Sequence, residues 1–127
     1  MEINKIVFGK KLFFEVWNPM KLYEYNSDMF AKIFLVVDGK VVGHFYLTFR
    51  GKRAWLWTLE IRTKYRGLGF GTTMLDKAVE ICKNNGYTNL VLECDKTNVV
   101  GNKLYRSFGF HIVDPHPNYY YTYYLNI

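Results

Sequence analysis

Residues 54–94 arrange a strand, a glycine-rich loop, a helix and a second strand in an order that few folds accommodate. The apolar run AWLWTLEI at 54–61 predicts the first strand, and NLVLEC at 89–94 predicts a buried second strand. Between them, three glycines in 66–71 precede apolar residues at helical spacing in 74–82. Strand, helix and strand in succession predict a right-handed crossover whose two strands are parallel.

Two turns precede this unit and predict an antiparallel meander. The run KIFLVV at 32–37 is rich in β-branched and aromatic residues, and Asp38-Gly39 after it is a strong hairpin signal. The run at 41–49 then pairs back, and Gly51-Lys52 provides a second turn into the strand at 54–61. The chain therefore enters the crossover from an antiparallel sheet.

The C-terminal third continues with a helix and two strands. Asn98 predicts the cap of a helix that ends at Gly109. Short strands at 110–113 and 119–126 close the chain. Together the elements predict a single α/β domain over residues 1–127, with a mixed, twisted sheet of six to seven strands.

The chain is small, basic and rich in aromatic residues. Its 127 residues carry a formal net charge of +6, and eleven Tyr, ten Phe and three Trp make up 19% of them. A hydrophobic content of 50% argues against disorder. The first thirty residues are neutral overall, whereas residues 50–66 hold six basic residues and one acidic residue. This charge indicates an anionic partner: a nucleic acid, an acidic surface or a phosphate-bearing cofactor.

The cysteines, the histidines and the apolar runs exclude several classes of protein. Cys82 and Cys94 are too few for a disulfide-dense scaffold, and we expect free buried thiols in a reducing cytosol. The histidines lie far from both cysteines in sequence, so we expect no zinc site and no other metal. The apolar runs are too short for a membrane span, and the first residues lack the apolar stretch of a signal peptide. These features predict a cytoplasmic protein.

The glycines of the stretch at 66–71, RGLGFG, lie where a strand ends and a helix begins. Glycines there let the backbone turn tightly, and exposed amides at the positive end of a helix favour a pyrophosphate. The spacing matches neither the dinucleotide fingerprint nor the P-loop. A plain turn from strand to helix is the structural alternative.

Several sequence blocks in this order resemble the GCN5-related N-acetyltransferase (GNAT) family. Arg66, Gly69 and Gly71 satisfy the Q/R-x-x-G-x-G/A loop of that family, and Leu59-Glu60-Ile61 matches the end of the preceding strand. The later blocks also occur in order: Leu92-Glu93, Asn98, Leu104-Tyr105 and Gly109-Phe110. The resemblance spans residues 32–113 and implies a GNAT-like fold with acetyl-CoA as cofactor and co-substrate.

The resemblance also implies roles for individual residues at the cofactor. The CoA pyrophosphate would lie beside Arg66 on the backbone amides of the loop, namely Gly67, Leu68, Gly69, Phe70, Gly71 and Thr72. The main chain of Leu59, Glu60 and Ile61 would pair with the pantetheine arm and polarise the thioester carbonyl. Asn98 would bond the pantetheine, although helix capping is the commoner role of an Asn before a helix.

Two further residues are candidates for proton transfer. Tyr105 lies seven residues after Asn98 on the same helix face and resembles the general acid that protonates the CoA thiolate, with core packing as its structural alternative. Glu93 is the leading candidate for the base, because it interrupts an apolar strand in which an ionised carboxylate is costly. An exposed strand position is the structural alternative for Glu93. A water molecule or Glu60 could replace it, and Trp55 occupies the position where histone-type members of the family have a Glu.

The leading functional hypothesis is acetyl transfer from acetyl-CoA to a primary amine by direct attack in a ternary complex. The alternatives are a basic nucleic-acid-binding module and a GNAT-fold protein that binds CoA without catalysis. The amine could be a small molecule, a peptide or a protein. Pro19 interrupts the 31 residues before the second strand. We therefore expect a shortened N-terminal helical region, at most one strand and a short helix around 19–30, and an open acceptor site or one completed in a homodimer.

A tyrosine-rich tail at 119–124 predicts a terminal strand. Tyr119, Tyr121 and Tyr123 would share one face, and Tyr120 and Tyr124 the other. Half-buried packing of the strand is the commoner role for such a row. The alternatives are an aromatic acceptor wall suited to a cationic amine and a dimer face.

Overall fold

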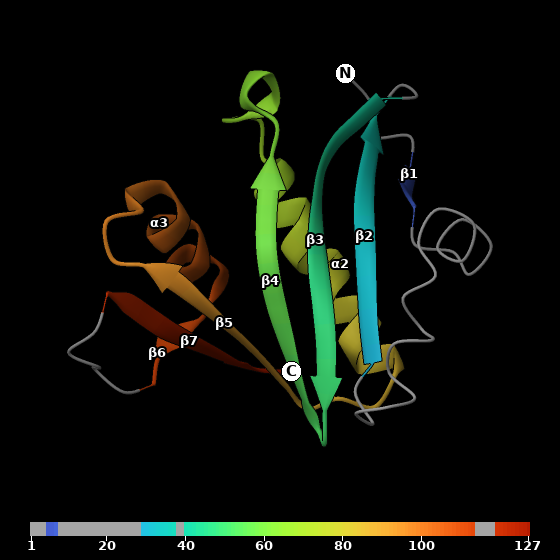
Figure 1. The fold of residues 1–127 in the computed structure, drawn as a ribbon, viewed down its shortest axis with the longest axis vertical. Coiled ribbons are helices and arrows are strands. Elements are labelled where there is room, and N and C mark those ends of the chain that lie inside the picture. The colour runs from blue at the N-terminus through green and yellow to red at the C-terminus, as the bar shows by residue number, and fades with distance from the viewer. Residues whose placement is uncertain (1–4, 8–28, 38–39, 114–118) are drawn as a thin grey trace.

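The computed structural model describes residues 5–7, 29–37, 40–113 and 119–127, and these form a seven-stranded sheet with two α-helices (Figure 1). The strand order is β1-β2-β3-β4-β5-β7-β6. In chain order, the elements are β1 (Lys5–Val7), β2 (Met29–Val37), β3 (Lys40–Arg50), β4 (Arg53–Ile61), the 3-10 turn η2 (Thr63–Tyr65), α2 (Phe70–Asn84), β5 (Asn89–Asp95), α3 (Val99–Phe108), β6 (His111–Ile112) and β7 (Tyr120–Asn126). The α/β class and the predicted number of strands are confirmed.

The predicted meander and crossover are both present. β2 pairs antiparallel with β3, and β3 pairs antiparallel with β4 through a turn in which Gly51 has a φ of +60°. The turn at 38–39 lies outside the described residues. β4 and β5 are parallel and are joined by α2, so the predicted order of strand, helix and parallel strand is confirmed.

The parallel pairing of β4 and β5 stops early. Its register runs from Arg53 opposite Asn89 to Trp55 opposite Val91, although β4 continues to Ile61. Beyond these pairs the two strands diverge in a V, as Figure 1 shows. β4 stays paired with β3 as far as Ile61. One backbone edge in the second half of β4 is therefore not paired with β5.

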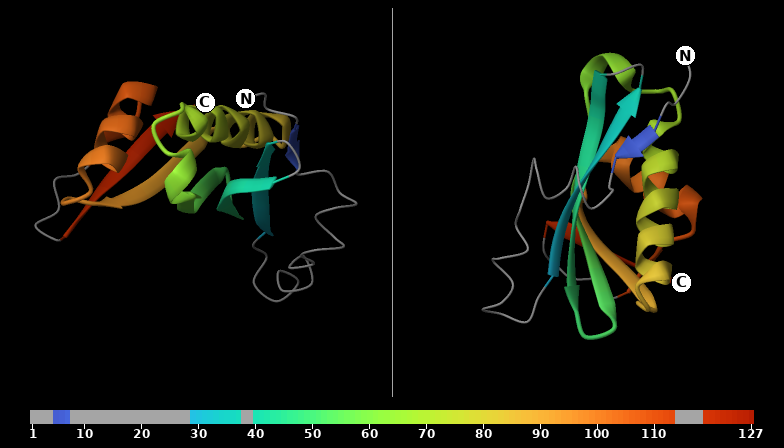
Figure 2. Two further views of the ribbon diagram at one scale, coloured as in Figure 1. Left: turned by 90° about the horizontal axis from the view of Figure 1, so that it is seen from above. Right: turned by 90° about the vertical axis from the view of Figure 1, so that its right-hand side faces the viewer.

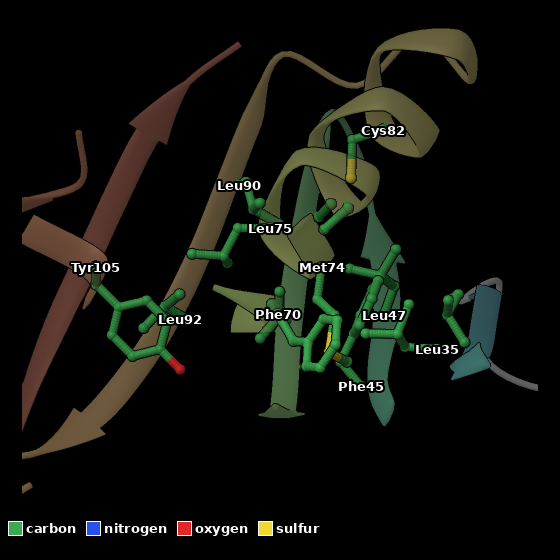
Figure 3. Packing of buried hydrophobic residues seen from close by; sticks show 14 of the residues in the cluster. Leu35, Phe45, Leu47, Phe70, Met74, Leu75, Cys82, Leu90, Leu92 and Tyr105 are labelled. Atoms are coloured by element: carbon green, nitrogen blue, oxygen red, sulfur yellow. The ribbon is translucent and has the colours of Figure 1, made fainter. Parts of the chain in front are cut away.

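Both helices lie on one face of the sheet (Figure 2). Alternate strand residues face them, which is why β3 alternates between buried and half-buried positions. Figure 3 shows the resulting core between α2 and the sheet. Its fully buried members include Leu35, Phe45, Leu47, Met74, Leu75, Cys82, Leu90 and Leu92. This core fixes α2 against β3 and β4, and so fixes the loop that leads into α2.

The tyrosine-rich tail is a paired strand, as predicted. β7 lies between β5 and β6 and is antiparallel to both. Tyr121 and Tyr123 stand opposite Cys94 and Leu92, and Tyr123 is fully buried on the helix side. Half-buried packing is confirmed for Tyr121 and Tyr124, whereas Tyr119 lies before the strand and is 82% exposed. An acceptor wall or a dimer face formed by the tail stays a prediction.

Cys82 and Cys94 are both free and buried. Among the described residues, no cluster of His, Cys, Asp or Glu side chains is suited to a metal ion. Within the same residues, no helix has the length and apolar character needed to cross a membrane. β1 supplies the predicted N-terminal strand, whereas most of the region predicted as a short helix lies outside the described residues.

Candidate active site

The connection from β4 to α2 is held by hydrogen bonds close to its ends. The amide of Arg62 donates to the Val42 carbonyl at 2.8 Å, and the amide of Tyr65 donates to the Arg62 carbonyl at 2.9 Å. The Arg66 side chain folds back, and its Nε donates to the Ile61 carbonyl at 2.9 Å. This bond fixes the guanidinium at the end of β4, while its two terminal nitrogens stay outside the bond and can meet an anion.

The three glycines of the loop serve two different structural purposes. Gly67 and Gly69 have φ angles of +76° and +86°, which L side chains rarely adopt. Gly71 lies inside α2, and a Cβ on it would be 2.9 Å from Cδ2 of Leu104 in α3. The first two glycines therefore shape the loop, and the third allows α2 and α3 to approach each other.

A second helix begins beside the first. Oδ1 of Asn98 accepts from the Gly101 amide at 2.9 Å, so the predicted capping role of Asn98 is confirmed. A Cβ on Gly101 would be 2.6 Å from Nδ2 of Asn98, so a larger residue there would force the capping side chain to shift. Neither α2 nor α3 has an acidic residue in its first turn. The positive ends of both helices are therefore left unneutralised by their own first turns.

These elements enclose a cavity of about 490 Å³. The end of β4, the glycine loop with the start of α2, and one side of α3 all contribute to it. Eleven of the thirteen predicted site residues line it: Leu59, Glu60, Ile61, Arg66, Gly67, Gly69, Phe70, Gly71, Thr72, Asn98 and Tyr105. Leu68 does not line it and is 57% exposed, because its side chain points out of the loop.

Tyr105 is almost completely enclosed at the inner wall of the cavity. Its exposed fraction is 8%, and its ring centroid lies 5.7 Å from that of Tyr123 and 5.9 Å from that of Phe110. Figure 3 shows the ring extending away from α3, with the hydroxyl at its far end. Burial, followed by the neighbouring Cys94 and Tyr123, raises the pKa of Tyr105 to about 12. The phenol therefore holds its proton at neutral pH and can donate it.

Glu93 does not belong to the cavity wall. It is exposed, stands opposite Thr122 of β7, and lies on the face of β5 that points away from the helices. The expectation that Glu93 is a costly carboxylate inside an apolar strand is therefore wrong, because alternation along the strand turns it to solvent. Its role as a base stays a prediction.

Four residues of the cavity wall were not predicted from the sequence as site residues: Tyr65, Val100, Gly101 and Leu104. Tyr65 was predictable as a site residue because it lies immediately before Arg66 in the chain. Gly101 lies three residues after Asn98, so helical spacing from Asn98 marks it. Val100 and Leu104 are four residues apart and share a neighbouring side of α3 that this spacing does not mark, so predicting them required knowing which side of α3 faces α2.

The basic run at 50–66 separates into two groups. Arg50 and Arg53 pair across the hairpin between β3 and β4, with Lys52 in its turn. Arg62, Lys64 and Arg66 lie at the opposite end of β4. Of these three, only Arg66 lines the cavity, whereas Arg62 and Lys64 line a separate hollow beside the end of β4. An anion-binding role for Arg62 and Lys64 at the cavity stays a prediction.

Comparison with known proteins finds similarity to acetyltransferases. Residues 7–110 match the family model described as the acetyltransferase (GNAT) family. N-alpha-acetyltransferase 50 of Danio rerio is 37% identical over 70 residues, which cover 54% of this chain and 42% of that protein. The chain spans 42%, 55% and 65% of the lengths of three curated relatives.

Two crystal structures have the same fold. The PaiA N-acetyltransferase of Thermoplasma acidophilum, in complex with coenzyme A, matches with a TM-score of 0.74 at 20% identity, over 95% of this chain and 81% of that one. The ribosomal-protein-S18-alanine N-acetyltransferase of Escherichia coli matches with a TM-score of 0.74 at 17% identity, over 97% and 93%. Since the family model covers far more than half of the sequence, the chain belongs to the acetyltransferase (GNAT) family.

Proposed function

We propose that this protein transfers the acetyl group of acetyl-CoA to a primary amine. The observation that carries the proposal is the cavity in which the open edge of β4 meets the N-termini of α2 and α3. Membership of the GNAT family supports the same chemistry.

The residues of the cavity fit a CoA-like ligand. The first amides of α2 and α3, the positive helix ends and Arg66 suit a pyrophosphate. The apolar wall that includes Leu104 and Val100 suits an extended chain. Because β4 has lost β5 as its neighbour at Leu59–Ile61, its backbone edge can pair with the amides of a pantetheine arm as an added strand would.

The proposed reaction is a direct attack. The amine nitrogen attacks the thioester carbonyl carbon, a backbone amide of β4 stabilises the carbonyl oxygen, and the carbon–sulfur bond breaks. Tyr105 gives its proton to the departing thiolate, and the proton released by the amine returns the phenol to its neutral form through solvent. With its pKa raised to about 12, Tyr105 is protonated at neutral pH.

Glu93 is the base that we propose for the amine. Its exposed carboxylate lies on β5 just past the last residue paired with β4, on the face of the sheet opposite the helices.

Two relatives are named as an N-alpha-acetyltransferase and a ribosomal-protein-alanine N-acetyltransferase, which favours the α-amine of a polypeptide as acceptor. The buried free thiols support a reducing compartment such as the cytoplasm. A homodimer stays a prediction.

The test combines binding with turnover. Calorimetry with CoA and acetyl-CoA should give saturable binding, and thiol release from acetyl-CoA should depend on a peptide with a free N-terminus. The same peptide with a blocked N-terminus is the control. Binding without release over a broad panel of amines would favour a non-catalytic CoA protein. Salt-dependent binding of RNA or DNA without binding of acetyl-CoA would contradict the proposal.

A further inference from the structure

Asn102 is a buried amide side chain that contacts three parts of the fold. It lies in α3 with an exposed fraction of 6%. Its Nδ2 donates to the carbonyl of Asp95 at 3.0 Å and to that of Asn98 at 2.8 Å. Its Oδ1 accepts from the Tyr123 hydroxyl at 2.6 Å. One side chain therefore ties together the end of β5, the turn into α3, and β7.

The segment that Asn102 holds is the turn that presents Asn98 to the cavity. Nδ2 also lies 3.4 Å from the Lys96 carbonyl, so it reaches three of the four carbonyls between Asp95 and Asn98. The carboxylate of Asp95 accepts from the Thr97 amide at 2.8 Å, and the Asn98 amide donates to the Asp95 carbonyl at 3.0 Å. The turn is thus held by hydrogen bonds within it and by the hydrogen bonds that the Asn102 side chain donates to its carbonyls.

Tyr123 connects the same amide to Tyr105. The Tyr123 hydroxyl bonds to Asn102, and the Tyr123 ring packs beside the Tyr105 ring at a centroid separation of 5.7 Å. Asn102 and Tyr105 are three residues apart on α3 and so lie on neighbouring positions of one helix face. The bond fixes the ring against which Tyr105 rests.

We infer that Asn102, held by Tyr123, is a positioning residue for the cofactor site, and this inference rests on the proposed function. It fixes the position of the turn that carries Asn98, and it fixes the orientation of the side of α3 that carries Tyr105. An apolar side chain of similar size would fill the same space without fixing the position of Asn98 or Tyr105. A purely structural role would stabilise the fold and leave the ligand affinity unchanged.

Two substitutions separate the contacts. Asn102→Leu removes every bond of the amide and keeps the approximate volume, so we expect the dissociation constant for CoA to rise about tenfold. Tyr123→Phe removes one hydroxyl and leaves the bonds to the turn, so we expect a smaller rise of about threefold. For both variants, the KM for acetyl-CoA should rise in parallel, while the KM for the amine stays constant.

The matched control is Ile33→Ala. Ile33 lies on β2, is buried with an exposed fraction of 1% against 6% for Asn102, and takes no part in the cavity wall. It should lower the melting temperature without changing the affinity for CoA. Calorimetry with CoA and thermal melts of all four proteins give the two readouts, and only the first involves the cofactor site.

The outcomes are distinct. Weaker CoA binding by Asn102→Leu and Tyr123→Phe, with normal binding by Ile33→Ala, supports the inference. Lower melting temperatures with unchanged affinity, or an equal loss of affinity in Ile33→Ala, would overturn it. If Asn102→Leu does not fold, Tyr123→Phe decides the question alone. A wild-type protein that binds no CoA would contradict the proposed function itself, which is a different result from equal binding by wild type and variants.

Discussion

The α carbon of Gly71 in α2 lies against Leu104 of α3, so closely that an added methyl group would be 2.9 Å from Cδ2 of Leu104. Both residues line the cavity. A glycine that the sequence motif suggests for close approach to a ligand thus also lets the Leu104 side chain pack directly against α2. Variants at this position will change stability as well as binding.

For Gly71→Ala, we expect stability to change by no more than about 1 kcal/mol, because the methyl group displaces the end of the Leu104 side chain while alanine favours the helix. The measurement is urea unfolding. Leu104→Ala in the same chain makes room for the methyl group, so the double variant should lose less than the sum of the two single variants. Strict additivity in this double-mutant cycle would show that the two side chains do not meet.

Arg66→Ala should weaken binding of acetyl-CoA about tenfold, because it removes a charge-assisted bond to the pyrophosphate and releases the end of β4. Lys52→Ala is the matched control, since it also removes one positive charge but lies in the hairpin turn at the other end of β4. Calorimetry at two salt concentrations measures both. An equal loss in the two variants would mean that general charge, rather than this site, attracts the ligand.

Tyr105→Phe should lower kcat about 100-fold while leaving the dissociation constant for CoA nearly unchanged. The phenylalanine keeps the ring packing and removes the proton donor. Since the pKa of Tyr105 is about 12, the wild-type rate should show no ionisation of this group between pH 6 and 10. Steady-state kinetics check both statements, and an unchanged kcat would remove Tyr105 as the acid.

Glu93→Gln tests the proposed base. We expect kcat to fall about tenfold or more, with the KM for acetyl-CoA unchanged, because the carboxylate lies outside the cofactor cavity. Glu60→Gln is the control, because Glu60 is an exposed carboxylate at the cavity wall on β4. If Glu60→Gln is the slower variant, the base lies on β4, and if neither is slow, solvent accepts the proton.

Stability should fall as the pH rises above about 9. Burial raises the pKa of the Cys82 thiol from 9.0 to about 12. The unfolded chain therefore releases this proton at a lower pH than the folded chain, and alkaline solution favours unfolding. Between pH 8 and 10 this group should reduce the free energy of unfolding by roughly 1 kcal/mol. Urea unfolding of Cys82→Ala should show a correspondingly smaller decrease, and an equal decrease would contradict the assignment.

The sequence predicted those elements whose signals are local. Asn98 and Gly109 mark the two ends of α3 because capping depends on the backbone within one turn. The crossover follows from the order of the strands around the glycine loop, since parallel neighbours need such a connection. Most of the cavity could be predicted for the same reason, because the loop and both helix starts are contiguous stretches.

Features that depend on contacts between distant segments could not be predicted. The solvent-facing orientation of Glu93 depends on which face of β5 the helices cover. The role of Asn102 depends on Tyr123, which lies 21 residues later in the chain. Likewise, the close packing at Gly71 depends on Leu104. Each needs the packed structure, because sequence spacing alone does not bring the partners together.

The early end of the pairing between β4 and β5 has a mechanical consequence. Three residue pairs join the two halves of the sheet at one end, and no strand bond between β4 and β5 restrains the other end in the described register. Beyond those pairs, side chains between α2 and α3, among them Leu104 against Gly71, contribute to the spacing of the cavity walls. A substitution in a helix can therefore change the dimensions of the site while every strand keeps its register.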